Sequence, residues 1–132
     1  MTLYAYLPKL FSKELKEVEE QLVRLLERTG ETVVLSTRPV PEELAARDPE
    51  QNPLDLVDAI ILEGTEPDPE VGYLLAYAIG QKKPLLHLTR KGHNRQNPLE
   101  TFTKSHRLPS SLVMAHYDPK SLERIVVQFL GR

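Results

Sequence analysis

The sequence predicts an α/β fold in which helices cover both faces of one parallel sheet. Short apolar segments alternate along the chain with longer stretches of helical periodicity. Residues 57–62 are apolar apart from Asp58, as expected of a strand that is covered on both faces. A length of 132 residues suits a modest core, so we expect a single domain over residues 1–132.

The first part of the chain predicts two strands and a helix. Residues 2–7 are short, apolar and aromatic, and a proline follows them, which indicates the first strand. Apolar residues recur at helical spacing over 12–29, and a glycine then provides a stop signal. The β-branched run 32–36 predicts the second strand. Four prolines interrupt residues 39–53, where we expect short helical turns at most.

The rest of the chain completes the alternation. The apolar run 57–62 predicts the third strand, and a helix that opens on a proline is expected over 69–81. Residues 84–88 and 112–116 predict the fourth and fifth strands, and 121–130 a closing helix with one apolar face. We therefore predict a flavodoxin-like three-layer sandwich with five parallel strands in the order 2-1-3-4-5.

Composition excludes several classes of protein. The chain has no cysteine, which rules out disulfides and thiolate metal sites, and it carries no zinc, calcium or P-loop signature, so neither a metal nor a cofactor is expected. It lacks an apolar stretch of membrane-spanning length and a signal-like start, which predicts a cytoplasmic protein without membrane contact. A basic stripe interleaved with aromatic residues is also missing, so no nucleic-acid partner is expected.

Charge is distributed unevenly. Residues 42–70 hold ten acids, whereas residues 71–117 hold seven lysines or arginines and one acid. We interpret these as two solvated faces, the usual role of charge runs. The alternative is that the basic half favours a phosphorylated ligand.

A ligand pocket is expected outside the carboxyl ends of the strands, where strands 1 and 3 diverge. This position involves residues 6–9, 63–70 and 89–93. Within it, Asp68 followed by Pro69 is typical of a helix N-cap with proline at the first helical position. Glu70 would be stabilised by the helix dipole in the first turn.

The same acidic loop and helix match a family motif. Asp68, Val71-Gly72, Leu75-Ala76, Ala78 and the turn 81–84 follow the order Asp-x-x-Val-Gly-x-Glu-Leu-Gly-x-Ala and Gly-Lys-Pro. Further matches, which extend the likeness over most of residues 2–90, are Leu3-Tyr4, Gly30, the run 32–34 and Asp58. The chain thus resembles the nucleoside 2-deoxyribosyltransferase family and its nucleotide N-glycosidase relatives.

The resemblance implies a nucleoside, nucleotide or related small ligand and a homodimer or larger assembly. The apolar last helix is compatible with such an assembly. A phosphate of the ligand could meet the basic loop after strand 4, although simple solvation of that loop is the alternative. The resemblance and the pocket position together give these candidate binding residues: Tyr4, Tyr6, Asp68, Gly72, Arg90 and His93.

Two departures from the family pattern affect catalysis. Leu74 stands where the family has its nucleophilic glutamate, and Leu7 stands where a glycine is usual. Leucine cannot form the covalent sugar ester, so we expect a catalytically degenerate binding protein. Alternatively, Glu70 could act as a substitute carboxylate in an active hydrolase or transferase, or the chain could be a structural partner protein.

Several other residues have ordinary structural interpretations. We expect Glu63 and Glu66 to be solvent-facing loop acids, with a role as substitute carboxylate as the alternative, and His87 to be a hydrogen-bonded core residue. Tyr73 and Tyr77 are four residues apart on a helix and most simply pack, with stacking of one of them on a base as an alternative. Two further histidines, His106 and His116, are too far apart in the sequence to suggest a metal site without further ligands.

Overall fold

The computed structural model describes residues 1–7, 13–37, 53–65, 69–92 and 110–131. The five strands of the sheet are β1 (Thr2–Tyr6), β2 (Thr32–Leu35), β3 (Ala59–Glu63), β4 (Leu85–Arg90) and β5 (Leu112–Tyr117). Within these ranges the helices are α1 (Lys13–Arg28), α2 (Pro69–Gln81) and α4 (Leu122–Phe129), together with the 3-10 turn η2 (Pro53–Leu56). None of the helices in these ranges is long and apolar enough to cross a membrane.

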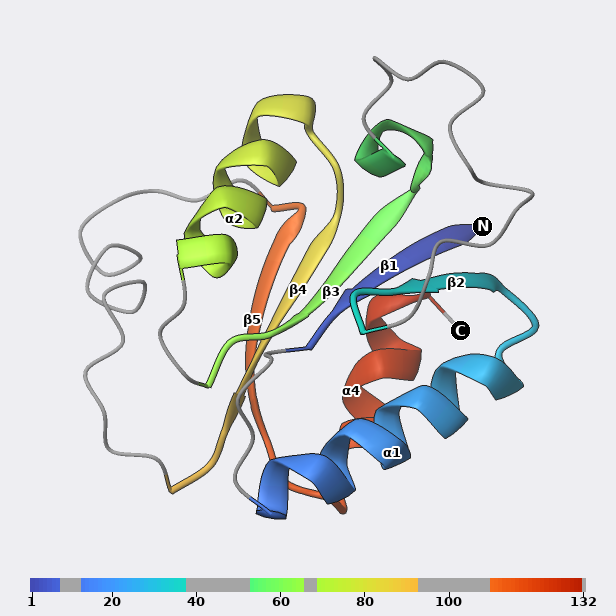
Figure 1. Cartoon of the computed structure of the whole chain (residues 1–132), viewed down its shortest axis with the longest axis vertical. Helices are drawn as coiled ribbons and strands as arrows, with labels where there is room; N and C mark the ends of the chain where they lie inside the picture. The colour runs from blue at the N-terminus through green and yellow to red at the C-terminus, as the bar shows by residue number, and fades with distance from the viewer. Residues whose placement is uncertain (8–12, 38–52, 66–68, 93–109, 132) are drawn as a thin grey trace.

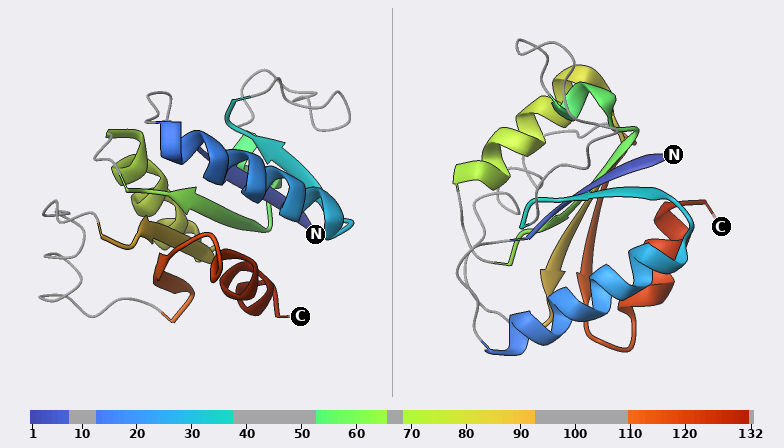
Figure 2. Two further views of the ribbon diagram at one scale, coloured as in Figure 1. Left: turned by 90° about the horizontal axis from the view of Figure 1, so that it is seen from below. Right: turned by 45° about the vertical axis from the view of Figure 1, so that its right-hand side comes forward.

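The sheet is parallel throughout and has the order β2-β1-β3-β4-β5, which confirms the predicted topology. Helix α2 covers one face, and α1 and α4 cover the other (Figures 1 and 2). The register pairs Glu63 of β3 with Leu88 of β4, and Arg90 of β4 with Tyr117 of β5. The carboxyl ends of these three strands therefore meet at one edge of the sheet.

Two apolar layers hold the helices to the sheet. Alternate residues of each strand point to opposite faces, so each central strand contributes to both layers. The layer under α1 and α4 contains Ala5, Ile61, Leu86 and Leu88, packed with Leu22, Leu26, Leu122 and Val126. The layer under α2 contains Ile60, Leu62 and Leu85, packed with Val71, Leu74, Leu75 and Ala78.

The apolar face predicted for the last helix is confirmed. Leu122 and Val126 are wholly buried, and Ile125, Phe129 and Leu130 pack against the same layer. Helix α4 therefore uses its apolar face to cover its own sheet.

The predicted bounds of β3, β4 and β5 require correction at their ends. Val57 lies before β3 and its N–H donates to Leu54 O at 3.3 Å, which closes the preceding turn. Lys83 Nζ fixes this turn by donating to Leu54 O at 2.7 Å and Val57 O at 2.8 Å. At the other end, β3 continues to Glu63 and the next two strands to Arg90 and Tyr117, because backbone pairing continues after the apolar run stops.

Candidate functional site

A buried carboxyl group lies at the carboxyl end of β3. Glu63 has only 2% of its surface exposed, so the prediction of a solvent-facing loop acid was wrong. Its Oε1 accepts the Thr65 N–H at 2.6 Å, and its Oε2 accepts a hydrogen bond from the Tyr117 hydroxyl. Hydrogen bonds of this kind make burial of a carboxyl group tolerable.

Glu63 forms a strand-end cluster with Thr65, Arg90 and Tyr117. The cluster lies at the carboxyl ends of β3, β4 and β5. The Arg90 N–H donates to Thr65 Oγ1 at 3.0 Å, and the Thr65 side chain also hydrogen-bonds Tyr117. Burial, and then the charge of Glu63, raises the pKa of Tyr117 far above its ordinary range, while the positive charge of Arg90 opposes that rise. Within the described ranges, Arg90 Nη1 is buried and has no hydrogen-bond partner.

On the opposite face of the sheet, the α2 side, the strand ends carry His87 and Thr89. His87 is wholly buried, as predicted, and its Nδ1 lies 3.5 Å from Thr89 Oγ1. The expected hydrogen bonding is incomplete, because His87 Nε2 has no partner among the described residues. Burial, and then the nearby His116, lowers the pKa of His87 to about 4, so this ring is neutral at pH 7.

Gly64 packs directly on the His87 ring. A Cβ added at Gly64 would lie 2.3 Å from His87 Nε2, closer than atoms of real side chains approach. The Gly64 N–H donates to Leu88 O at 2.8 Å, which holds the glycine in the ladder beside β4. Only glycine therefore fits between Glu63 and Thr65 without displacing the histidine.

The predicted binding residues do not all lie together. Tyr6 is buried in the layer under α2, and Tyr4 is half-buried beside Glu70, with burial and then Glu70 raising its pKa. Gly72 is exposed, and a Cβ added there would meet no atom within 4 Å. Arg90 is the last residue of β4 and belongs to the strand-end cluster. Asp68, Glu66 and His93 lie outside the described residues.

The two positions that depart from the family pattern both fill the core. Leu74 is wholly buried in the layer under α2, and Leu7 is buried in the opposite layer. The Leu7 N–H donates to Ser36 Oγ at 2.9 Å, which ties the end of β1 to the end of β2. Glu70, one helical turn before Leu74, is exposed. Glu70 and Leu74 thus have different surroundings although both lie on α2.

Tyr73 and Tyr77 lie away from the strand-end cluster. Their rings stack with centroids 6.4 Å apart, as expected of two tyrosines four residues apart, although Tyr73 is 51% exposed and lies outside the core. The Tyr77 hydroxyl donates to Asp55 Oδ1 in η2, which precedes β3. Burial, and then this hydrogen bond, raises the pKa of Tyr77 to about 12. Tyr77 therefore lies toward the amino end of the sheet.

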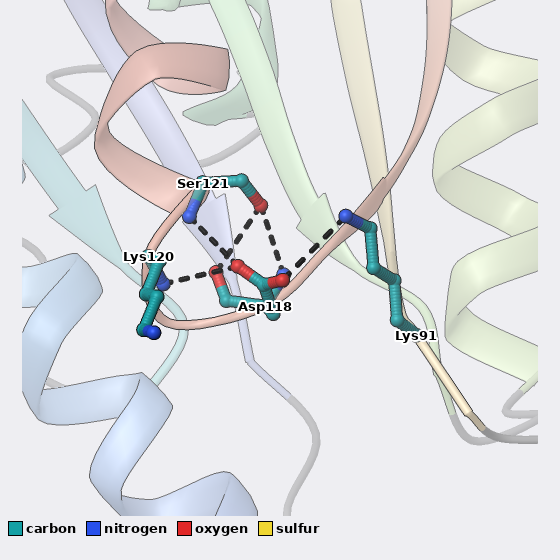
Figure 3. A network of polar contacts seen from close by, with 4 residues as sticks. All are labelled: Lys91, Asp118, Lys120 and Ser121. Carbon is teal, nitrogen blue, oxygen red and sulfur yellow. Dashed lines mark hydrogen bonds and ion pairs between the residues drawn. The ribbon is translucent and has the colours of Figure 1, made fainter.

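A polar turn follows β5 next to the cluster (Figure 3). Asp118 Oδ1 accepts the N–H groups of Lys120 at 3.0 Å and Ser121 at 2.8 Å, and Lys91 Nζ lies 3.5 Å from Asp118 Oδ2. Hydrogen bonds from Ser121, followed by the charge of Lys91, lower the pKa of Asp118. The turn thus joins the residues after β4 and β5, close to Arg90 and Tyr117.

Sequence reasoning missed Tyr117, and it included Thr65 in the expected pocket range 63–70 without singling it out. The predicted fifth strand ended one residue too early, which left Tyr117 outside the sheet. One signal was available, because Tyr117 continues the alternation of Val113 and Ala115 on one face of β5. Thr65 offers no comparable signal, since its contacts depend on how β3 and β4 pair.

The cluster can donate hydrogen bonds to a ligand more readily than it can supply a nucleophile. The Glu63 carboxyl accepts from two donors and is buried, whereas Arg90 Nη1 is a donor without a partner. Among the described residues, no group of three or more histidine or acidic side chains could hold a metal ion. Neither the family models nor the curated protein sequences give a match to this chain. The deoxyribosyltransferase resemblance therefore stays a prediction from its motif residues.

Proposed function

We propose that this protein is a catalytically degenerate relative of the nucleoside 2-deoxyribosyltransferases that binds a nucleoside, nucleotide or related small ligand. The observation that carries the proposal is the position of Leu74. Its side chain is wholly buried among apolar residues, where it replaces the nucleophile with a packing group. Binding without release of a base is the expected behaviour of such a site.

The strand-end cluster supports a binding role. Arg90 Nη1 is a buried donor that lacks a partner among the described residues, and it lies where ligands of open parallel sheets bind. Convergent polar groups of this kind fix the orientation of a ligand in a pocket. Arg90 would donate to an acceptor oxygen of the ligand, and Glu63 and Tyr117 would hold the strand ends in place.

The alternative is an N-glycoside hydrolase or transferase that uses Glu70. One observation favours it, since Glu70 lies in the first turn of α2, close enough to Tyr4 to raise the pKa of that tyrosine. Glu70 is nevertheless exposed, without the apolar surroundings that tune catalytic carboxylic acids. The third alternative, a structural partner protein, predicts neither binding nor turnover.

A thermal-shift screen with nucleosides, deoxynucleoside monophosphates and ribose phosphates tests the proposal, with chromatography of every hit for free base. Ligand binding raises Tm by mass action, so weak binders are visible at high concentration. We expect a shift without free base. We also expect Arg90→Gln to lose the shift and the matched exposed-arginine control Arg124→Gln to keep it.

Two outcomes would overturn the proposal. A shift with base release that Glu70→Gln abolishes would establish the hydrolase or transferase instead. No shift with any compound would favour the structural partner protein. The homodimer or larger assembly that the resemblance implies stays a prediction.

A further inference from the structure

The strand-end cluster contains one acid, Glu63, and one base, Arg90, on the same face of the sheet. In β3, Ile61 packs in the layer under α1 and α4, so Glu63, two residues later, points to that side as well. In β4, Leu88 packs in the same layer, and Arg90 follows it by two residues. Glu63 Oε1 accepts the Thr65 N–H at 2.6 Å, and Thr65 Oγ1 accepts the Arg90 N–H at 3.0 Å. The acid and the base therefore belong to one polar unit.

The hydrogen bonds of Glu63 are those of an ionised carboxylate. Its Oε1 accepts from the backbone N–H of Thr65, a group that can only donate. Its Oε2 accepts from the Tyr117 hydroxyl, and the Thr65 hydroxyl donates in turn to Tyr117. Because both oxygens act as acceptors, neither carries the proton of a neutral carboxylic acid. The negative charge of Glu63 therefore balances the positive charge of Arg90 within the cluster.

The cation that follows Arg90 is also paired with an acid. Lys91 Nζ lies 3.5 Å from Asp118 Oδ2 in the turn after β5 (Figure 3). On the other face of the sheet, Glu70 adds a negative charge beside Tyr4. Sites for phosphate groups normally collect several cations that lack an acidic partner. The described end of β4 does not have that character.

Arg90 Nη1 is the donor that this balanced cluster leaves without a partner within the described ranges. We propose that Glu63 is a specificity-determining residue, which makes Arg90 bind an uncharged carbonyl or hydroxyl oxygen and reject an anion. An uncharged oxygen accepts the hydrogen bond without repulsion, whereas a phosphate or carboxylate group is repelled by the buried charge of Glu63. This inference rests on the proposed ligand binding, and it favours a nucleoside over the matching monophosphate.

Isothermal titration calorimetry of each 2′-deoxynucleoside and its 5′-monophosphate tests the inference. We expect wild type to bind a nucleoside about tenfold or more tightly than the monophosphate. Glu63→Gln removes the charge and keeps a similar size and one acceptor oxygen, so this preference should fall by about tenfold. A purely structural role of Glu63 would change both affinities equally. The matched control Glu123→Gln removes the same charge from an exposed position of α4 and should keep the wild-type preference.

The outcomes separate this inference from the proposed function. Wild type that binds the monophosphates as tightly as the nucleosides would overturn the inference and leave the proposed function intact. An unchanged preference in folded Glu63→Gln would show that Glu63 does not set it. Binding of no compound would overturn the proposed function, and this inference with it. The wild-type comparison requires no variant, so it decides the question even if Glu63→Gln does not fold.

Discussion

On the face of the sheet that α1 and α4 cover, the strand-end residue Glu63 is hydrogen-bonded through both of its carboxyl oxygens, whereas on the face that α2 covers His87 is hydrogen-bonded incompletely. Glu63 accepts from Thr65 and Tyr117. His87 has only a 3.5 Å contact from its Nδ1 to Thr89, and its Nε2 has no partner among the described residues.

The difference indicates how this end of the sheet is stabilised. A buried carboxyl group costs too much without donors, so Glu63 requires Thr65 and Tyr117 as partners. A neutral histidine can be buried at lower cost, and its depressed pKa reflects that burial. The first face is therefore specified by hydrogen bonds and the second by the close packing of Gly64 on the His87 ring.

The largest expected effect tests the packing side of this comparison. Gly64→Ala places a methyl group 2.3 Å from His87 Nε2, and the wholly buried ring has little room to move. We expect the free energy of unfolding to fall by about 3 kcal/mol, measured by urea denaturation. In a His87→Ala background the same substitution should cost much less, because the obstructing ring is gone. Equal costs in both backgrounds would show that the clash is not with His87.

The second prediction concerns the pH dependence of stability and again the sheet face that α2 covers. The pKa of His87 is lowered to about 4, so between its unfolded value of 6.5 and about 4 the unfolded chain binds more protons than the folded one. Stability therefore rises with pH in this window, and wild type should lose about 2 kcal/mol between pH 7 and pH 5. His87→Leu should remove most of that loss while other titrating groups remain. If both proteins lose stability equally over this range, His87 is not the group responsible.

The third prediction tests the hydrogen-bonded face. Tyr117→Phe removes the hydroxyl that donates to Glu63 while keeping the buried ring. We expect a loss of about 1.5 kcal/mol in the free energy of unfolding, since a buried carboxyl oxygen loses a donor. The control Tyr73→Phe removes a hydroxyl from a half-exposed ring and should change stability by less than about 0.5 kcal/mol. Similar values for the two variants would mean that the contact with Glu63 contributes little.

The fold was easier to predict from the sequence than the strand-end cluster around Glu63. Apolar runs of strand length alternated with helical periodicity, and these local patterns were enough for the strand order. The strand ends were harder to predict because polar residues there resemble loop residues. Glu63 ends an apolar run and so looked solvent-facing. Its burial depends on Tyr117, 54 residues further along the chain, and no local pattern reports that contact.

The candidate site shows the same limit. Arg90 was predicted from its place in the loop region after the fourth strand, but it is the last residue of β4, and its role in ligand binding stays a prediction. The exposure of Gly72 and the burial of Leu74 depend on the rotation of α2 against the sheet, which the motif alone does not determine. The outward side of α2 is itself partly apolar, so helical periodicity does not mark the core-facing side of this helix.

The smallest expected effects come from a matched pair of threonines, one for each group of hydrogen bonds. Thr65 and Thr89 are both buried, and valine has nearly the same shape as threonine. Thr65→Val removes the acceptor of the Arg90 N–H and the contact to Tyr117, so about 1 kcal/mol should be lost. Thr89→Val removes only the 3.5 Å contact to His87 and should cost less than about 0.5 kcal/mol. A larger loss for Thr89→Val in urea denaturation would mean that hydrogen bonds matter more on the sheet face that α2 covers than on the face that α1 and α4 cover. The contrast between the two faces would then be wrong.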